Sequence, residues 1–274
     1  MSVRSERAVT ASTDDPLVFE EMIDAGVRRL TGEPTAALSW RRILGAPERI
    51  AVKFNSVGAR ELDTNNALAL TLVDRLEAAG FQRRAITLVE VPEYVIERAG
   101  CQKAASGWDG SVEVGDGREP LARYWSEADA VINVALLKTH KIAGMSCSLK
   151  NLSHAIIQHP ARFHANGCSP YVGQIVRQPV VAEKLKLNLV NALRLVIRNG
   201  PEAATEDIVD YGALIFGFDP LATDQIGWST LAIERHQRGM PGEIEVPYLV
   251  SAAVGGVGRW RPREIDHQSI VASG

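Results

Sequence analysis

The 274-residue sequence contains little cysteine, and its three cysteines are poorly placed for pairing. Cys101, Cys147 and Cys168 are odd in number, lie far apart and form no C-x-x-C motif. This pattern excludes the disulfide scaffolds that are typical of small secreted proteins. It also provides too few thiolates for an iron–sulfur cluster held by this chain alone.

The sequence also lacks a strong charge bias and long apolar segments. Its formal net charge is -3, which gives no basic field that would attract nucleic acid. No apolar run is long enough to span a bilayer, and the first fifteen residues are polar without the apolar core of a signal peptide. We therefore expect a cytoplasmic protein that binds neither nucleic acid nor membrane, and the composition leaves a homo-oligomer open.

Strand and helix patterns alternate along residues 16–274, which we expect to form a single α/β domain after a flexible N-terminal tail over residues 1–15. This alternation is typical of a layered α/β fold with a mainly parallel sheet flanked by helices. The expected strands are 49–54, 85–89, 111–114, 130–137, 193–197 and 213–218, and the expected helices are 16–30, 35–44, 65–79, 92–99, 180–191 and 221–235.

Polar side chains stand at the end of several of these expected strands. In an open α/β sheet, ligands bind beyond the carboxyl ends of the strands, which meet at one edge when the strands are parallel. We therefore expect the polar residues at these ends to surround one shared cleft. They are Lys53 and Asn55, Glu90, Lys138 and His140, Asn199, and Asp219.

The segment from Asp129 to His164 carries the densest group of candidates. A buried strand ends in K-T-H-K, and a turn at Ala143-Gly144 leads to an expected helix from about Ser146. A helix start offers free backbone N–H groups to a carboxylate or phosphate. We predict a small anionic metabolite as ligand, His140 and Lys150 as catalytic residues, and Lys53, Asn55, Lys138, Ser146 and Asn151 as substrate-binding residues. Alternatively, His140 is an ordinary loop histidine and Lys150 a surface lysine.

Three further histidines, His154, His159 and His164, follow within eleven residues. Imidazole groups at this density suit a divalent metal such as Ni, Zn, Fe or Cu. We predict His164 as a metal ligand together with His159 or Asp219. The alternatives are that two of the histidines are exposed to solvent and that Asp219 only caps the following helix. The loop over residues 166–179 is long enough to be a lid or a subunit interface.

The chain resembles the domain of unknown function 362 family over roughly residues 50–227. The resemblance rests on K-F-N after the first strand, on A-D-A-V-I-N-V-A-L-L-K-T-H-x-x-A-G-M-S-x-S-L-K-N-L, and on the late G-F-D-P-L-A-T-D. It implies an α/β protein, cytosolic or exported, of a type that often occurs with ferredoxin-type modules. The cysteines of such a module are absent from this sequence, which argues against electron transfer by this chain.

A more distant similarity connects the chain with the nickel-pincer lactate racemase family. The stretch H-K-I-A-G-M-S-C-S-L-K is similar to that family's P-H-x-x-A-G-x-S-G-G-x-K. The resemblance implies Lys150 as the tether of the cofactor, His164 as the metal ligand and His140 as the acid or base. The sequence departs from the family where Cys147-Ser148 replace two glycines, and it has no upstream Gly-Thr-His near residues 90–92.

Taken together, the residues and the resemblances favour an enzyme that performs isomerase- or epimerase-like chemistry, or a related proton or hydride transfer, with or without a metal. Clustered lysines would stabilise negative charge that develops next to a carboxylate. Two alternatives stay open. The chain could be an accessory protein that binds a cofactor or an iron–sulfur redox partner without turnover, or a regulatory protein that binds an anionic ligand.

Overall fold

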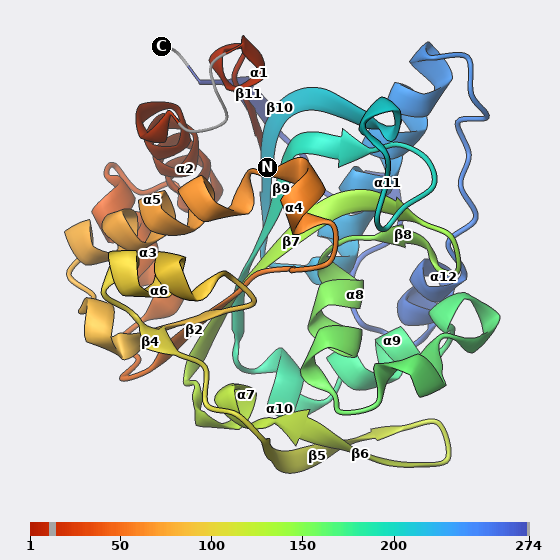
Figure 1. Cartoon of the computed structure of the whole chain (residues 1–274), viewed down its shortest axis with the longest axis horizontal. Helices are drawn as coiled ribbons and strands as arrows, with labels where there is room; N and C mark the ends of the chain where they lie inside the picture. The colour runs from red at the N-terminus through yellow and green to blue at the C-terminus, as the bar shows by residue number, and fades with distance from the viewer. Residues whose placement is uncertain (11–14, 273–274) are drawn as a thin grey trace.

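The computed structural model describes residues 1–10 and 15–272, and a mixed sheet of mostly parallel strands runs through its centre (Figure 1). In this part of the chain, nine strands form the sheet in the order β11-β1-β10-β9-β7-β2-β3-β4, with β8 paired to β7. The strands are β1 (Ser2–Arg4), β2 (Ile50–Lys53), β3 (Ile86–Val89), β4 (Gln102–Lys103), β7 (Ala130–His140), β8 (Gly144–Ser146), β9 (Leu185–Val196), β10 (Ile208–Gly217) and β11 (Ser269–Val271). A separate hairpin is formed by β5 (Trp108–Val114) and β6 (Gly117–Ala122).

Helices cover both faces of the sheet. One face carries α2 (Pro16–Thr31), α3 (Ala36–Leu44), α5 (Asn65–Ala78) and α6 (Glu93–Ala99). The other carries α7 (Arg123–Glu127), α8 (Ser148–Ser153), α9 (Tyr171–Val176), α10 (Pro179–Ala182), α11 (Pro220–Gln237) and α12 (Pro247–Val254). Two short helices, α1 (Arg7–Thr10) and α4 (Ala59–Leu62), complete the set. No helix in the described ranges is both long and apolar enough to cross a membrane.

Alternation along the central strands explains the two layers. In β7, Val131 belongs to the core beneath α8 and α11, whereas Ile132 belongs to the core beneath α2 and α5. In β2, Ala51 and Val52 divide in the same way. Successive side chains of a strand point to opposite faces, so a nearly continuous apolar run is what a strand covered on both faces requires. The predicted α/β fold class is confirmed.

The prediction of a helix over residues 180–191 is wrong. Only α10 is helical there, and Leu185–Val196 form β9, which pairs parallel with β7 and antiparallel with β10. Leu185, Leu187 and Leu189 follow the two-residue period of a strand, and residues 187–193 are buried. Leucine, lysine and asparagine have little intrinsic preference for strands, so pairing with two neighbouring strands decides the outcome.

Residues 2–4 do not belong to a flexible tail as predicted. They form β1, which lies between β10 and β11, and the Val3 side chain is completely buried. Residues 7–10 are helical, and residues 11–14 of the predicted tail lie outside the described residues. A strand of three residues is too short to show a periodic pattern, so only its sheet partners reveal it.

Candidate functional site

Two lysines and two asparagines that were predicted to bind substrate lie together near the carboxyl ends of β2 and β7. Nζ of Lys53 donates to Oδ1 of Asn151 at 2.5 Å and to Oε2 of Glu90 at 2.5 Å. Asn55 lies between the lysines: its Nδ2 donates to Asn151 Oδ1 at 3.1 Å, and its Oδ1 accepts from Lys138 Nζ at 3.0 Å. We call these five residues the lysine–asparagine cluster.

A chain of hydrogen-bonded, buried asparagines holds Asn151 of this cluster in place. Nδ2 of Asn151 donates to Oδ1 of Asn133 at 2.7 Å, and Nδ2 of Asn133 donates to Oδ1 of Asn188 at 2.9 Å. Asn133 and Asn188 are register partners on β7 and β9, and both are fully buried. A satisfied buried network of this kind holds Asn151 in one orientation. Asn133 and Asn188 were missed from the sequence, although an asparagine that interrupts the apolar run of residues 130–137 was the available signal.

The cluster holds more buried positive than negative charge. Lys53 is 0% and Lys138 1% exposed, and Glu90 is the carboxylate that pairs with Lys53. Burial lowers the pKa of Lys138 to about 7, and repulsion from Lys150 and Lys53 adds to this effect. Burial also lowers the pKa of Lys53 and of Lys150, although Glu90 opposes the shift at Lys53. A bound anion would favour the charged form of these amines, so the surroundings suit an anionic ligand.

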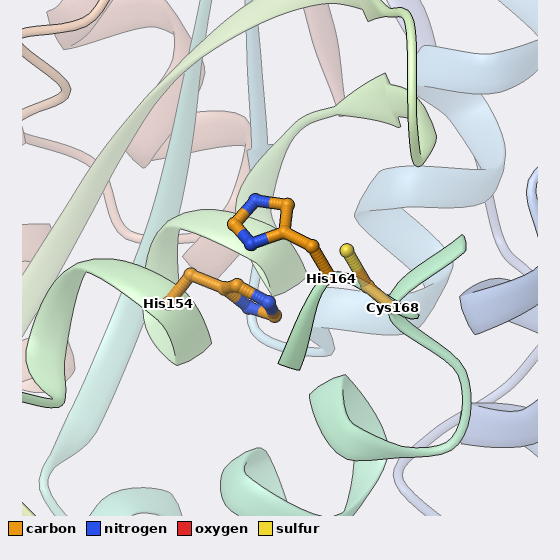
Figure 2. Close-up of side chains that lie close together, drawn as sticks. All are labelled: His154, His164 and Cys168. Atoms are coloured by element: carbon orange, nitrogen blue, oxygen red, sulfur yellow. The ribbon is translucent and has the colours of Figure 1, made fainter. Parts of the chain in front are cut away.

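The two predicted catalytic residues, His140 and Lys150, belong to a second group, contributed by β7, α8 and the segment after α8. Nζ of Lys150 lies 3.3 Å from Nε2 of His164, and the His140 ring stacks on the His164 ring with centroids 5.9 Å apart. His154 meets His164 edge to face at 4.7 Å. Figure 2 shows His154 and His164 close to Cys168, and one potential ligand atom from each of these three lies within 4.8 Å of the others. We call these five residues the histidine cluster.

His140 is held in one neutral form by its own loop. Its Nδ1 accepts from the backbone N–H groups of Ile142 and Ala143, both at 3.2 Å. The remaining proton is therefore on Nε2. Burial, reinforced by the positive charge of Lys150, lowers the pKa of His140 to about 3. His140 is therefore neutral at neutral pH and offers its Nε2–H as a hydrogen-bond donor. Of the predicted acid–base role, we keep the donor and not the proton acceptor.

Two residues predicted as metal ligands lie outside the histidine cluster. Asp219 caps α11, and its Oδ2 accepts from the backbone N–H of Arg259 at 2.7 Å. His159 is on the surface, where its Nδ1 lies 2.7 Å from Oε1 of the buried Glu119. Among the described residues, the histidine that joins His164 is His154, and the third potential ligand is Cys168, which the sequence interpretation did not select.

The expected anion site at the start of a helix is occupied by the protein itself. The helix α8 begins at Ser148 rather than Ser146, which lies on β8 opposite Lys138. Both carboxylate oxygens of Asp224 lie 3.3 Å from the backbone N of Leu149 at this helix start. Asp224 is fully buried, and burial raises its pKa to about 7. The backbone N–H of Leu149 at the start of α8 is therefore used internally.

A cavity of about 540 Å³ adjoins the lysine–asparagine cluster. Glu90 belongs to both, because its Oε2 accepts from Lys53 while its side chain also lines the cavity. Glu90 has a positive φ of 60°, an unusual conformation for a residue other than glycine, at the end of β3. The lining residues are Ser56, Ala59, Arg60, Asp63, Asn65, Asn66, Glu90, Val91 and Pro92.

The residues around Lys150 fit a nickel-pincer cofactor only in part. Lys150 and His164 are neighbours, as a tether and a metal ligand would be. Cys147 and Ser148, however, stand in place of two glycines, and both side chains are fully buried. Cys147 packs against α11, where a Cβ added to Gly227 would lie 3.1 Å from its sulfur. Because these side chains fill the position of the glycines, we derive no reaction step through that cofactor.

Comparisons with known proteins give a family and distant similarity to solved structures. The family described as "Domain of unknown function (DUF362)" matches residues 50–229. The curated proteins contain no match. The structure of the lactate racemase apoprotein from Thermoanaerobacterium thermosaccharolyticum is similar to 77% of this chain, with 12% identity and a TM-score of 0.40. The aligned part covers 55% of the racemase chain, so this chain spans about half of its length.

Proposed function

The chain belongs to the family described as Domain of unknown function (DUF362), and from this premise we propose that it is an enzyme that acts on a small metabolite bearing a carboxylate or phosphate. The observation that carries the proposal is the lysine–asparagine cluster. Two fully buried lysines and a third lysine nearby outnumber the one carboxylate paired with them, Glu90, and this carboxylate also lines the adjoining cavity. Burying such charge is costly unless a counter-charge is supplied, and an anionic ligand supplies it.

In this proposal the two clusters have different roles. Lys138 and Asn55 hold the anionic group. Lys53, whose three N–H bonds point to Phe54, Glu90 and Asn151, keeps Asn151 and hence Asn55 in place. Lys150 has a pKa lowered by burial, so a neutral amine is accessible to take a proton from the ligand. His140 donates from Nε2 to the oxygen on which negative charge develops. Removal of a proton next to a carboxylate and its return on either face is an isomerase- or epimerase-like reaction.

The first test measures binding of small anions. Wild-type protein is titrated with lactate, malate and inorganic phosphate by calorimetry, beside Lys138→Met and Lys141→Met. Lys141 is an exposed neighbour in the same loop and serves as the matched control. We expect at least one anion to bind the wild type and Lys141→Met, and the affinity to fall by more than about tenfold in Lys138→Met, because a charge-assisted hydrogen bond in a buried site contributes about 1.5–3 kcal/mol. Equal affinities in all three proteins would remove the proposal.

The second test separates an enzyme from a regulatory binding protein. Any 2-hydroxy acid that binds is incubated with the protein in D₂O, and exchange of its α-hydrogen is followed by NMR. We expect exchange with the wild type and none with Lys150→Met, since Lys150 is the proposed proton acceptor. Tight binding without exchange in the wild type would support the regulatory alternative instead.

A further inference from the structure

The histidine cluster contains a donor set that anion binding does not use. From it, we infer that His154, His164 and Cys168 form a binding site for one divalent transition-metal ion of the zinc type. The inference goes beyond the proposed function and does not rest on it. The three side chains come from the end of α8 and from the segment that follows it, and their potential ligand atoms lie within 4.8 Å of one another (Figure 2).

The spacing is close to what a tetrahedral ion needs. Zinc binds imidazole nitrogen at about 2.0–2.1 Å and thiolate sulfur at about 2.3 Å, so neighbouring ligand atoms in a tetrahedron lie about 3.5 Å apart. A contraction of roughly 1 Å from the observed upper limit would complete the site. His154 and Cys168 are buried and fix two corners, whereas His164 is partly exposed and leaves a route for the ion.

Backbone carbonyl groups orient both imidazole rings. Nδ1 of His164 lies 3.0 Å from the carbonyl oxygen of Pro160, and Nε2 of His154 lies 3.0 Å from that of Phe163. A carbonyl only accepts, so each of these nitrogens carries the proton and the opposite nitrogen keeps its lone pair. In His154 this opposite nitrogen, Nδ1, lies 3.0 Å from Oγ of Ser153 and would exchange the hydroxyl for the ion. Metal-binding histidines usually donate their second ring N–H in this way, which fixes the ring and its tautomer.

The donor types select the class of metal. Two imidazoles and one thiolate suit zinc, cobalt, nickel or copper, whereas magnesium and calcium prefer oxygen ligands. Three protein ligands leave a fourth position for water or another small ligand. The amine of Lys150 now lies 3.3 Å from Nε2 of His164, so an ion bound to this nitrogen would replace the lysine as its partner.

The backbone before the sulfur is unusual in a way that fits a held ligand. Asn166, Gly167 and Cys168 all have positive φ, at 53°, 62° and 67°. Asparagine adopts this region more readily than most residues, but cysteine does so rarely, and the surrounding structure must offset the strain at Cys168. The conformation belongs to the short segment that carries both His164 and Cys168 to His154.

Cobalt provides the most direct test, because a bond between Co²⁺ and thiolate gives a charge-transfer band in the near ultraviolet. Chelator-treated, reduced protein is titrated with Co²⁺ and then with Zn²⁺. We expect one equivalent of Co²⁺ to bind, with a charge-transfer band and strong visible bands of a tetrahedral site, and Zn²⁺ to displace it. Wild-type protein without a charge-transfer band would overturn the inference.

Matched variants identify the ligands. Cys168→Ser should lose the charge-transfer band, and His164→Gln should weaken Co²⁺ binding by more than about tenfold. Cys101→Ser and His159→Gln, which change a cysteine and a histidine outside the cluster, should leave band and affinity unchanged. If the band persists in Cys168→Ser, or if His164→Gln binds as the wild type does, the site is elsewhere and the inference is wrong. His164 is only partly buried, so we expect His164→Gln to fold. It therefore still tests the site if Cys168→Ser fails to fold.

The two proposals can fail separately. The metal titration uses no anionic metabolite, and the calorimetric test of anions can be run on chelator-treated protein. Metal binding without anion binding would support the metal site and contradict the proposed function. Anion binding without metal binding would support the proposed function and contradict the metal site.

Discussion

Lys138 is a buried residue whose protonation state changes near neutral pH. Its amine is buried, and its hydrogen-bond partners are the neutral oxygens of Asn55 and Val57. Burial lowers its pKa to about 7 from the ordinary 10.5. Between these two values the unfolded chain binds a proton that the folded protein has released. The contribution of Lys138 to stability therefore rises with pH across this window, and below pH 7 its cost is fully present.

Lys138→Met should remove this dependence. We expect the free energy of unfolding, measured by urea titration from pH 7 to 9.5, to rise less steeply with pH in Lys138→Met than in the wild type, by up to about 1.4 kcal/mol per pH unit. Lys53 and Lys150 contribute slopes of the same sign that both proteins share. Lys141→Met serves as the control, and identical slopes in all three proteins would show that Lys138 has an ordinary pKa.

Two histidines should stay neutral at every physiological pH. Burial lowers the pKa of both His140 and His154 to about 3, and the charge of Lys150 adds to the effect. In ¹⁵N-labelled protein, their ring nitrogens should show no titration between pH 5 and 8, with the proton of His140 on Nε2. In urea the same residues should titrate near 6.5. A folded-state midpoint above pH 5 for His140 would restore its role as a proton acceptor.

Single residues of the site were predictable where the local pattern was unusual. Lys53, Lys138 and His140 stand out because charge follows a buried strand, and the structure brings each of them to one of the two clusters. Cys168 and Asn188 gave no such signal, since a lone cysteine and a polar residue in a mixed segment are common. Asn133, the partner of Asn188, lies 55 residues away in the chain, and the turns between His154 and Cys168 decide whether these two meet, so only the folded arrangement reveals the pairs.

At the scale of elements, the tight hairpin of β7 and β8 positions the loop that holds His140. Gly144 has φ of 78°, and a Cβ at this position would lie 1.9 Å from the carbonyl oxygen of Glu245. Gly144→Ala should destabilise the protein by about 3 kcal/mol or more, since both the backbone and a fixed neighbour must move. Gly256→Ala is the control: φ is 73° there, and no neighbour within 4 Å meets the added Cβ, so about 1–2 kcal/mol is expected. Urea unfolding measures both, and equal losses would contradict the steric argument.

Elements were predictable where one period of hydrophobicity dominated. The helix predicted over residues 16–30 is observed as α2, and the strand predicted over 130–137 is observed as the longer β7. The error at β9 arose because Leu and Lys suit a helix locally, while pairing with β7 and β10 outweighs that preference. The start of α8 was misplaced by two residues because β8 intervenes, which is a contact with β7 and not a property of residues 144–146 alone.

At the scale of the molecule, the first strand joins the two ends of the described chain. β1 lies between β10 and β11, so residues 2–4 connect the N-terminal segment with residues 269–271. Val3→Asp would bury a charge in the core beneath α2. We expect a loss of several kcal/mol, or failure to fold, because an isolated carboxylate in an apolar core is strongly disfavoured. Arg4→Asp, which changes an exposed side chain of the same strand, is the control. Similar thermal midpoints for the two variants would show that the buried side of β1 does not contribute to stability.

Asp224 has a wider consequence for recognition. Its carboxylate already accepts from the backbone N–H at the start of α8. The backbone donors that bind phosphate at many helix starts are therefore not available to a ligand here. Recognition of the ligand is left to lysine amines, which are point charges and lack the planar donor geometry of arginine. Such a pocket distinguishes ligands mainly by their negative charge, so we expect several small acids to bind.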